Sequence, residues 1–219
     1  MHCKAVIFDL DGTLIDTERL YRKYWPEALR HFGYVLSDER ALMLRSLGRP
    51  FAPKQFREWF GEDFDYAEVR AYRKQIIEAH IKEHGVDAKP GARETLLALR
   101  ELGITVAIAT ATDPERTERY LKLAGLDGLV ETIISATMVA QGKPAADIYL
   151  YACSTLGLEP SECIAVEDAP NGVRSAFSAG CKVVMIPDQT EPDEELQPML
   201  YARFDALPGL IGLVKEEKE

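Results

Sequence analysis

The sequence has no long hydrophobic segment: nowhere do about 18 uncharged apolar residues, the length that a membrane-spanning helix requires, follow one another. The first residues, MHCKAVIFDLDG, contain no apolar run of signal-peptide length before charged residues interrupt it. There is also no internal repeat, and the only compositionally biased segment is the charged tail KEEKE. We therefore expect a soluble, cytoplasmic protein without a membrane partner.

The sequence is also short of positive charge. It has 26 lysine and arginine residues against 36 aspartate and glutamate residues, which gives a net charge of -10. Such a chain repels the phosphate backbone of nucleic acids, and no basic stripe compensates for this. Nucleic acid is therefore not expected as a partner, and a small phosphorylated ligand would need cations close to its own binding site.

Cysteine is scarce, and its spacing carries no metal or redox pattern. The four cysteines show neither CxxC spacing nor the paired spacing of a zinc site. Three of them lie among apolar residues, so we expect buried, reduced thiols with a structural role. A sustained heptad pattern is also absent, so we expect a monomer.

Short apolar runs alternate with helical patterns along most of the chain. The 219 residues are 47% hydrophobic, enough for one core plus an insertion, so we expect one or two domains. β-branched runs bounded by turn residues are typical of strands buried on both faces, and strand-helix repetition indicates a parallel sheet. The predicted fold class is α/β, a doubly wound (Rossmann-like) parallel sheet. Its expected strands are residues 5–8, 104–109, 132–135, 163–166 and 182–186.

One region breaks the alternation. Residues 17–86 show helical patterns alone, and the turn-like segment DAKPG at residues 87–91 closes them. We expect a core made of residues 1–16 and 87–219, with an inserted all-helical domain over residues 17–86. An insertion after the first strand lies above the carboxyl ends of the strands, where doubly wound sheets bind ligands.

The first expected strand leads into an acidic turn, AVIFDLDGTLIDT at residues 5–17. Alternate side chains of an extended chain point the same way, so Asp9 and Asp11 are aimed at one small volume beyond the strand. Two neighbouring carboxylates repel each other and call for a cation, and oxygen ligands favour magnesium. A simple turn with Asp16 or Thr17 as helix cap is one alternative. An EF-hand calcium loop is another, but its spacing differs.

Two further loops follow expected strand ends. The second strand finishes at Thr110, where backbone N–H groups opening the next helix could hold a phosphate. A capping role for Thr112 or Asp113 is the structural alternative. Lys143 precedes a proline and a helix in QGKPAADIY, and an ordinary solvated lysine is its alternative.

The fourth strand ends at Glu167 and Asp168, just before Pro170 opens a helix. Taken alone, these acids also suit a helix N-terminus for purely structural reasons. Taken together, four loops at one edge of the sheet supply two aspartates, a threonine, a lysine and a further acidic pair. Packing alone does not demand this combination, so we expect a functional site there.

The segments FDLDGTLIDT, AT at residues 109–110, GKPAADIY and VEDAPNG resemble, in order, the four motifs of the haloacid dehalogenase superfamily. The resemblance spans nearly the whole chain. The helical insertion is similar to the cap of the subgroup that contains β-phosphoglucomutase-like and phosphoglycolate-phosphatase-like enzymes. The resemblance implies a magnesium-dependent phosphatase that hydrolyses a small phosphate ester, such as a sugar phosphate, through an aspartyl-phosphate.

The resemblance also implies roles for individual acids. Asp9 would attack phosphorus, and Asp11 would give a proton to the leaving alcohol and take one from the hydrolytic water. A magnesium ion would be held by Asp9, the backbone carbonyl of Asp11 and Asp168, with Glu167 beside it.

The phosphoryl oxygens would be held by Lys143, Thr110 and the backbone N–H of Ala111. Dehalogenation is disfavoured, because the dehalogenases of this family lack the second aspartate of the first motif, whereas this chain has Asp11.

Two insertion residues bear on the choice of reaction. Arg49, within LGRP, could bind a distal phosphate as in the mutases, or could be a surface arginine. Tyr21 stands where the β-phosphoglucomutase pattern has a histidine, which disfavours a mutase. We expect no catalytic role for the four histidines. A phosphosugar mutase is therefore the alternative reaction, and a non-catalytic module that binds phosphorylated metabolites is an alternative of another class.

Overall fold

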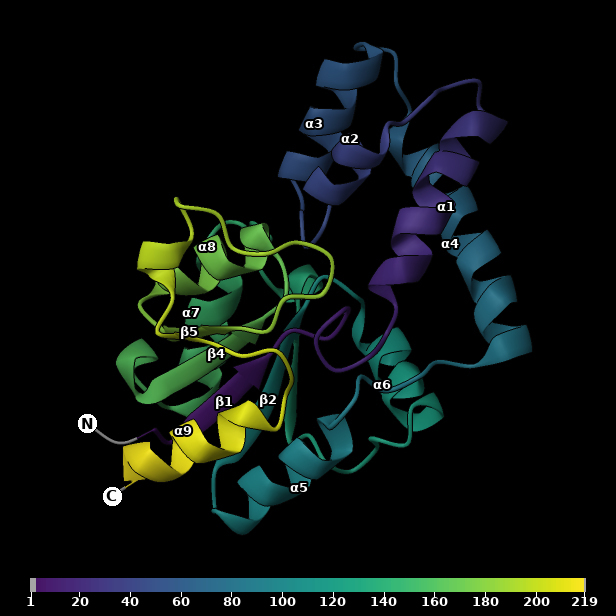
Figure 1. The fold of residues 1–219 in the computed structure, drawn as a ribbon. Helices are drawn as coiled ribbons and strands as arrows, with labels where there is room; N and C mark the ends of the chain where they lie inside the picture. The colour runs from purple at the N-terminus through teal and green to yellow at the C-terminus, as the bar shows by residue number, and fades with distance from the viewer. Residues whose placement is uncertain (1–2, 219) are drawn as a thin grey trace.

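A single parallel sheet forms the centre of the computed structural model, which describes residues 3–218 (Figure 1). Its strand order is β3-β2-β1-β4-β5-β6, so the direction of strand addition reverses at β1. The five strands expected from the sequence are confirmed within one residue at each end. The strands are β1 Ala5–Phe8, β2 Thr105–Thr110, β3 Thr132–Ser135, β4 Cys163–Glu167, β5 Lys182–Met185 and β6 Ala202–Arg203.

Helices cover both faces of the sheet because β1 buries alternate side chains in opposite directions. Val6 and Phe8 pack into one apolar cluster with α5, α6 and α9, whereas Ala5 and Ile7 pack into a second cluster with α7 and α8. The doubly wound α/β prediction is therefore correct. These helices are α5 Ala92–Glu101, α6 Pro114–Leu123, α7 Asp147–Leu156, α8 Pro170–Ala179 and α9 Gly209–Lys218.

The residues 17–86, here called the insertion, are helical as expected and stand above the carboxyl ends of the strands (Figure 1). They have an apolar centre of their own, in which the Trp25 and Phe56 rings lie 4.7 Å apart and Trp59 packs alongside. The chain enters and leaves the insertion through paired backbone, since Asp16 N donates to Asp87 O at 2.9 Å. Its helices are α1 Glu18–His31, α2 Asp38–Met43, α3 Phe51–Phe60 and α4 Tyr66–His84.

Three elements depart from the expected pattern. Residues 37–48 lie in the stretch with helical patterns, but they form less helix than the pattern predicts, because α2 ends at Met43 and Ser46 adopts a left-handed φ of 53°. The sequence analysis does not predict β6, because a strand of two residues is too short for a periodic signal. It does not predict α9 either, because the second half of this helix lies in the charged tail. Short 3₁₀ segments lie at η1 Ala136–Met138, η2 Pro160–Glu162 and η3 Gln197–Met199.

The four cysteines are buried and free of disulfides, which agrees with the structural role expected for them. Within residues 3–218, no helix is both long enough and apolar enough to span a membrane.

Candidate active site

The carboxyl ends of β1, β2 and β4 bring the expected residues together. Lys143 Nζ lies 2.6 Å from Asp9 Oδ1, 2.6 Å from Glu167 Oε1 and 2.8 Å from the carbonyl oxygen of Ala109. The lysine is buried, so the interpretation as an ordinary solvated side chain is wrong. Burial by itself lowers the pKa of Lys143, but Asp9 and Glu167 outweigh it and raise that pKa, so the ammonium stays charged.

Three buried acids form a cluster beside this lysine. One carboxylate oxygen each of Asp9, Glu167 and Asp168 lies within 4.8 Å of the others. Burial, together with the neighbouring negative charges, raises the pKa of Glu167 to about 8 and that of Asp168 to about 7. Glu167 Oε2 and Asp168 Oδ1 are buried without a hydrogen-bond partner. Buried carboxylate oxygens gathered in this way fit a hard divalent cation, which prefers oxygen ligands.

Two residues that the sequence reasoning missed fix Glu167 in place. The Tyr149 hydroxyl donates to Glu167 Oε1, and both groups are buried. A Cβ added to Gly172 would lie 1.9 Å from Glu167 Oε2, so only glycine leaves room for this carboxylate. Tyr149 ends the segment GKPAADIY and Gly172 ends VEDAPNG, so both lie within the motif-like segments, but their contacts with Glu167 arise only from the packing of α7 and α8.

Asp11 lies outside the three-acid cluster and faces the start of the insertion. Its carboxylate accepts hydrogen bonds from the hydroxyl groups of Thr17, at 2.5 Å, and Thr112, at 2.9 Å. Thr17 precedes α1 but makes no side-chain capping bond, so the structural alternative for this threonine is wrong. The two hydroxyls hold the Asp11 carboxylate in one orientation.

Gly12 lets the acidic turn close around Asp168. The residue has a φ of +88°, and an added Cβ would lie 2.5 Å from Asp168 Oδ2 and 2.8 Å from Glu18 Cγ. Both the left-handed backbone and the close approach require glycine at this position. The opening turn therefore has two tasks, to direct two carboxylates forward and to let a third approach from β4.

The two expected phosphate-binding residues at the end of β2 differ in their exposure. Ala111 is exposed and lines the main pocket. The Thr110 side chain is fully buried, and its hydroxyl oxygen accepts a hydrogen bond from Thr112 N at 3.0 Å. Asp113 caps α6 by accepting from Arg116 N, so the structural alternative for Asp113 is correct.

Two buried charged residues of the insertion that the sequence reasoning missed lie close to Asp168. The Arg45 guanidinium donates to the Asp168 carboxylate, to the Asp168 carbonyl at 3.1 Å and to Thr190 at 2.6 Å. Arg45 Nε also lies 3.9 Å from the buried carboxylate of Glu18. Burial and the nearby acids raise the pKa of Glu18 well above its usual range. The position of Glu18 directly after the acidic turn was the one available signal.

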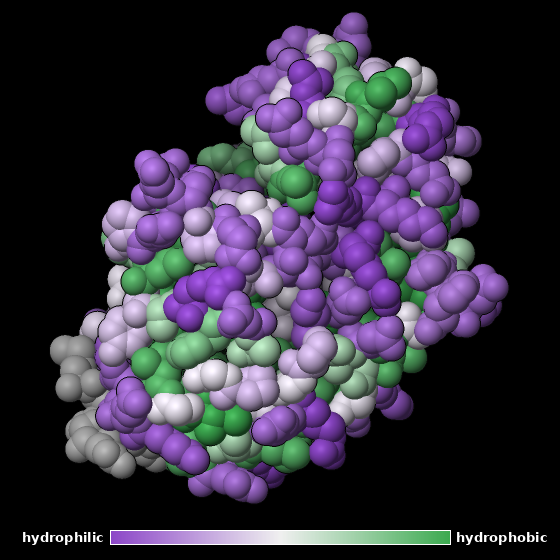
Figure 2. All heavy atoms as spheres, in the orientation of Figure 1, coloured by the Kyte–Doolittle hydropathy of each residue, from purple (hydrophilic) through white to green (hydrophobic). Residues whose placement is uncertain are grey.

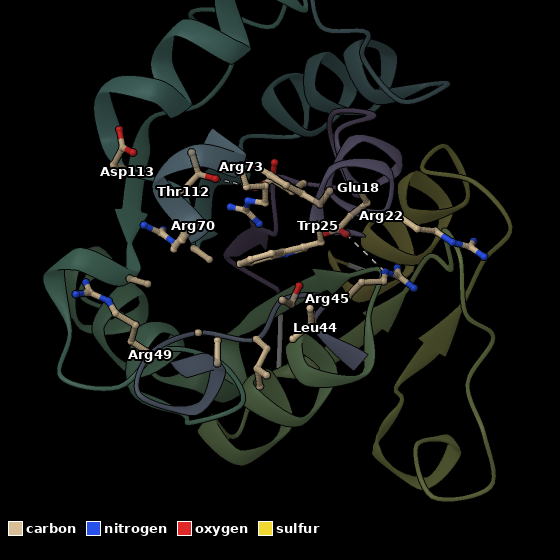
Figure 3. Close-up of a pocket in the computed structure, with 18 of the residues that line it drawn as sticks. Glu18, Arg22, Trp25, Leu44, Arg45, Arg49, Arg70, Arg73, Thr112 and Asp113 are labelled. Atoms are coloured by element: carbon tan, nitrogen blue, oxygen red, sulfur yellow. Dashed lines mark hydrogen bonds and ion pairs between the residues drawn. The ribbon is translucent and has the colours of Figure 1, made fainter. Parts of the chain in front are cut away.

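A pocket opens between the sheet edge and the insertion, where Figure 2 shows hydrophilic side chains gathered. Tyr21 and Arg49, the two insertion residues considered as substrate contacts, line it, but Arg49 is exposed and points away from the centre in Figure 3. Within the described residues, no histidine lines this pocket. Six arginines contribute to its wall: Arg22, Arg45, Arg49, Arg70, Arg73 and Arg116.

Comparisons with known proteins show the family of the chain. A model of the haloacid dehalogenase-like hydrolases matches residues 3–180. Hexitol phosphatase A of Escherichia coli (strain K12) is 35% identical over 204 residues, 92% of each chain. Protein CbbY of Rhodobacter capsulatus is 34% identical over 228 residues, which cover 96% of this chain and 100% of CbbY.

A solved structure gives the same result for the fold. The crystal structure of CbbY from Rhodobacter sphaeroides in complex with phosphate aligns with a TM-score of 0.79 and 26% identity, covering 95% of this chain and 96% of that chain. The four motifs, the sheet order and the relatives therefore lead to one assignment: the chain belongs to the haloacid dehalogenase-like hydrolases.

Proposed function

We propose that this protein is a magnesium-dependent phosphatase that hydrolyses a small phosphorylated metabolite through an aspartyl-phosphate intermediate. The observation that carries the proposal is the arrangement around Asp9, whose carboxylate contacts Lys143 and belongs to the buried cluster with Glu167 and Asp168. The phosphatase among the matched relatives supports the same reaction class.

Asp9 is the proposed nucleophile. One Asp9 oxygen attacks phosphorus, the bond from phosphorus to the ester oxygen breaks, and the alcohol leaves. Burial raises the pKa of Asp9, while Lys143 opposes this shift and favours the carboxylate form that attack requires. Lys143 and the Ala111 N–H then stabilise the charge on the phosphoryl oxygens. Because the Thr110 hydroxyl already accepts a hydrogen bond from Thr112 N, its proton is free for donation to the same group.

Asp11 is the proposed acid and base. It gives a proton to the departing alkoxide, and then takes one from the water that attacks phosphorus and frees Asp9. Because Thr17 and Thr112 both donate to the Asp11 carboxylate, its orientation is fixed before the substrate binds. This acid therefore serves both half-reactions without moving.

Magnesium is the proposed cofactor, held by Asp9, Asp168 and the Asp11 carbonyl, with Glu167 adjacent. When bound, it offsets the repulsion between the Asp9 carboxylate and the substrate phosphate. The all-oxygen donor set and the two unpartnered oxygens of Glu167 and Asp168 support this choice.

The insertion is the proposed cap domain, residues 17–86, above a core of residues 1–16 and 87–219. Two backbone hydrogen bonds join it to the loop that carries Lys143: Gly48 N donates to Lys143 O at 2.8 Å, and Gly142 N donates to Arg49 O at 2.7 Å. A cap in this position excludes bulk water and strengthens the electrostatic interactions at Asp9. Tyr21 and Arg49 would contact the part of the substrate that leaves.

Release of phosphate from p-nitrophenyl phosphate tests the proposal. We expect turnover in the presence of Mg²⁺, loss of turnover with EDTA, and no detectable turnover in Asp9→Asn. Asp127→Asn, an exposed position outside the pocket, is the matched control and retains activity. Failure to hydrolyse any phosphate ester would instead favour the non-catalytic binding module.

A phosphosugar mutase uses the same nucleophile and would also place Arg49 on a distal phosphate. Conversion of β-glucose 1-phosphate to glucose 6-phosphate, followed with glucose-6-phosphate dehydrogenase, separates the two reactions. We expect free phosphate to form and glucose 6-phosphate not to accumulate, since Tyr21 replaces the histidine of the mutase pattern.

A further inference from the structure

Arg73 is a buried cation that has no acidic partner in the part of the chain that the structure describes. It lies on α4 in the wall of the pocket, and 8% of its surface is exposed. Its Nε is buried without a hydrogen-bond partner, and among the described residues no carboxylate lies within ion-pair distance of its guanidinium. An unpaired buried charge costs several kcal/mol in folding free energy, so its retention calls for a compensating function.

Three other arginines of the pocket show that such pairing is available in this fold. Arg22 pairs with Asp38, Arg45 with Asp168, and Arg116 with Glu78 at 3.0 Å. Figure 3 shows Arg73 near the centre of the pocket beside Trp25, whereas Arg22 extends away from it.

Arg70 adds a second cation next to Arg73. The two are three positions apart on α4 and therefore share one face of the helix. Arg70 is half-buried, lines the same pocket and, among the described residues, has no ion-pair partner either. Burial lowers the pKa of Arg73, and the positive charges of Arg70 and Arg116 act in the same direction. A mutually repelling pair of guanidinium groups is a site for an anion.

Aromatic rings hold the Arg73 guanidinium in place. Its central carbon lies 4.2 Å from the Trp25 ring centroid and 4.8 Å from the Tyr21 ring centroid. These cation–π contacts stabilise the side chain but leave its N–H donors unused. A planar guanidinium that is fixed in this way presents paired donors, which match the oxygens of a carboxylate or a phosphate.

We infer that Arg73 and Arg70 bind a second anionic group on the substrate, a phosphate or a carboxylate, remote from the phosphate that Asp9 attacks. The inference rests on the proposed function and narrows it: the substrate class is small phosphate esters that carry a further negative group. The two anionic ends contact different parts of the protein, Lys143 at the sheet edge and Arg73 on the insertion.

Matched substrate pairs test the inference. Fructose 1,6-bisphosphate against fructose 6-phosphate reports a second phosphate, and 3-phosphoglycerate against glycerol 3-phosphate reports a carboxylate. We expect kcat/KM to be at least tenfold higher for the doubly anionic member of at least one pair. The pair that shows the preference identifies the anion.

Substitution of the arginines separates recognition from catalysis. Arg73→Gln is expected to lower the preference by about 10-fold to 100-fold through KM, and to lower kcat/KM for p-nitrophenyl phosphate, which has no second anion, by a smaller factor. Arg73→Lys keeps the charge but not the paired donors and is expected to recover part of the preference. Arg57→Gln, exposed on α3, makes the same charge change outside the pocket and leaves the preference unchanged.

A binding measurement removes the dependence on turnover. In Asp9→Asn, isothermal titration with the preferred compound is expected to show at least tenfold weaker binding when Arg73→Gln is added. If Arg73→Gln does not fold, Arg70→Gln, at the more exposed position, is expected to weaken the same binding. Equal kcat/KM within both pairs, or a preference that both variants retain, overturns the inference while hydrolysis of p-nitrophenyl phosphate leaves the proposed function standing. Absence of hydrolysis with every ester overturns the proposed function instead.

Discussion

Lys143 Nζ lies 2.6 Å from Asp9 Oδ1, although 134 positions separate the two residues in the chain. The contact arises because β1 and β4 are adjacent in the sheet, and the loop of Lys143 crosses their carboxyl ends. A single buried ammonium thereby compensates Asp9 and Glu167 together.

Removal of that ammonium should damage both activity and stability. Lys143→Met is expected to lower kcat by about 10²-fold to 10³-fold, since the phosphoryl group loses a fixed cation. It should also lower the free energy of unfolding by about 3–5 kcal/mol, because two buried carboxylates lose their partner. Steady-state kinetics and urea denaturation measure the two effects.

An exposed ion pair of equal length is the control. Lys4 Nζ lies 2.6 Å from Glu162 Oε1, but the lysine side chain is 57% exposed. Lys4→Met should therefore change the free energy of unfolding by less than about 1 kcal/mol. Equal losses in the two variants would show that burial does not decide the strength of the Lys143 contacts.

Substitution of Gly12 is a second test of the site. Comparison with Gly33 separates the effect of backbone strain from the effect of a steric clash. Gly12→Ala forces an alanine into left-handed backbone and places its Cβ 2.5 Å from Asp168 Oδ2. Gly33 has a similar φ of +82°, but nothing lies within 4 Å of the position that an added Cβ would take. Gly33→Ala should therefore lower the free energy of unfolding by about 1–2 kcal/mol and leave activity intact.

Gly12→Ala should lower the free energy of unfolding by more than Gly33→Ala does. It should also lower kcat/KM at least tenfold, because Asp168 must move away. Thermal denaturation and the Mg²⁺ dependence of turnover measure the difference. Equal stability and equal kcat/KM in the two variants would show that the close approach of Asp168 to Gly12 is not needed for activity.

The sequence reasoning succeeded where local pattern decides the structure. Buried strands are recognisable as β-branched runs, and parallel strands must align their carboxyl ends, so the meeting of Asp9, Lys143 and Asp168 followed from topology. It failed where a residue acts through tertiary position. Arg45 enters the acidic cluster because α2 stops early at Met43, and no periodic pattern encodes that stop.

Arg73 is another residue whose role follows from its tertiary position and not from the sequence pattern. In sequence it is one of several charged residues on a long helical segment, and such residues usually face solvent. It becomes informative only when the fold buries it among Trp25 and Tyr21, with no acidic partner in residues 3–218. Tyr149 and Gly172 are comparable, since both act on Glu167 across a helix–sheet contact.

The buried acids predict how stability depends on pH in the metal-free protein. The pKa of Glu167 is raised to about 8 and that of Asp168 to about 7, from usual values near 4, chiefly by burial. Between about pH 4 and pH 8 the folded state therefore holds protons that the unfolded state has released. The free energy of unfolding then falls as the pH rises through this window.

Mg²⁺ should weaken this trend, because a bound cation favours the deprotonated acids. Without Mg²⁺ we expect the melting temperature to fall by at least about 2–4 °C from pH 5 to pH 8, the equivalent of about 1 kcal/mol. Saturating Mg²⁺ should remove most of the fall, and Asp168→Asn should make it shallower. A melting temperature that rises steadily over this pH range would contradict the assignment.

Thr112 gives a test of the acid and base. Its hydroxyl donates to Asp11 Oδ2 at 2.9 Å and is one of the two donors that hold this carboxylate in place. Thr112→Val, which keeps the shape of the side chain, should lower kcat several-fold in steady-state kinetics, because Asp11 is then less firmly oriented. Asp113→Asn, at the cap of α6, should lower kcat less, because Asp113 makes no hydrogen bond to Asp11.

The contact between two glycines predicts that the insertion must approach the core closely for catalysis. A Cβ at Gly48 would lie 2.7 Å from Gly142 Cα, a backbone atom that cannot rotate away. Gly48→Ala should therefore hold the insertion away from the loop of Lys143 and break the two backbone hydrogen bonds between them. A displacement of about 1 Å at a reacting site costs about 10²-fold in rate, so kcat/KM should fall by about 10-fold to 100-fold.

Gly212 is the matched control for this substitution, because it lies in α9 with nothing within 4 Å of an added Cβ. Gly212→Ala should leave kcat/KM unchanged and should stabilise the helix by up to about 1 kcal/mol. Small-angle scattering should show a larger radius of gyration for Gly48→Ala than for Gly212→Ala. Wild-type kinetics in Gly48→Ala would mean that catalysis does not require this contact, because the Lys143 loop would then be positioned by the core alone.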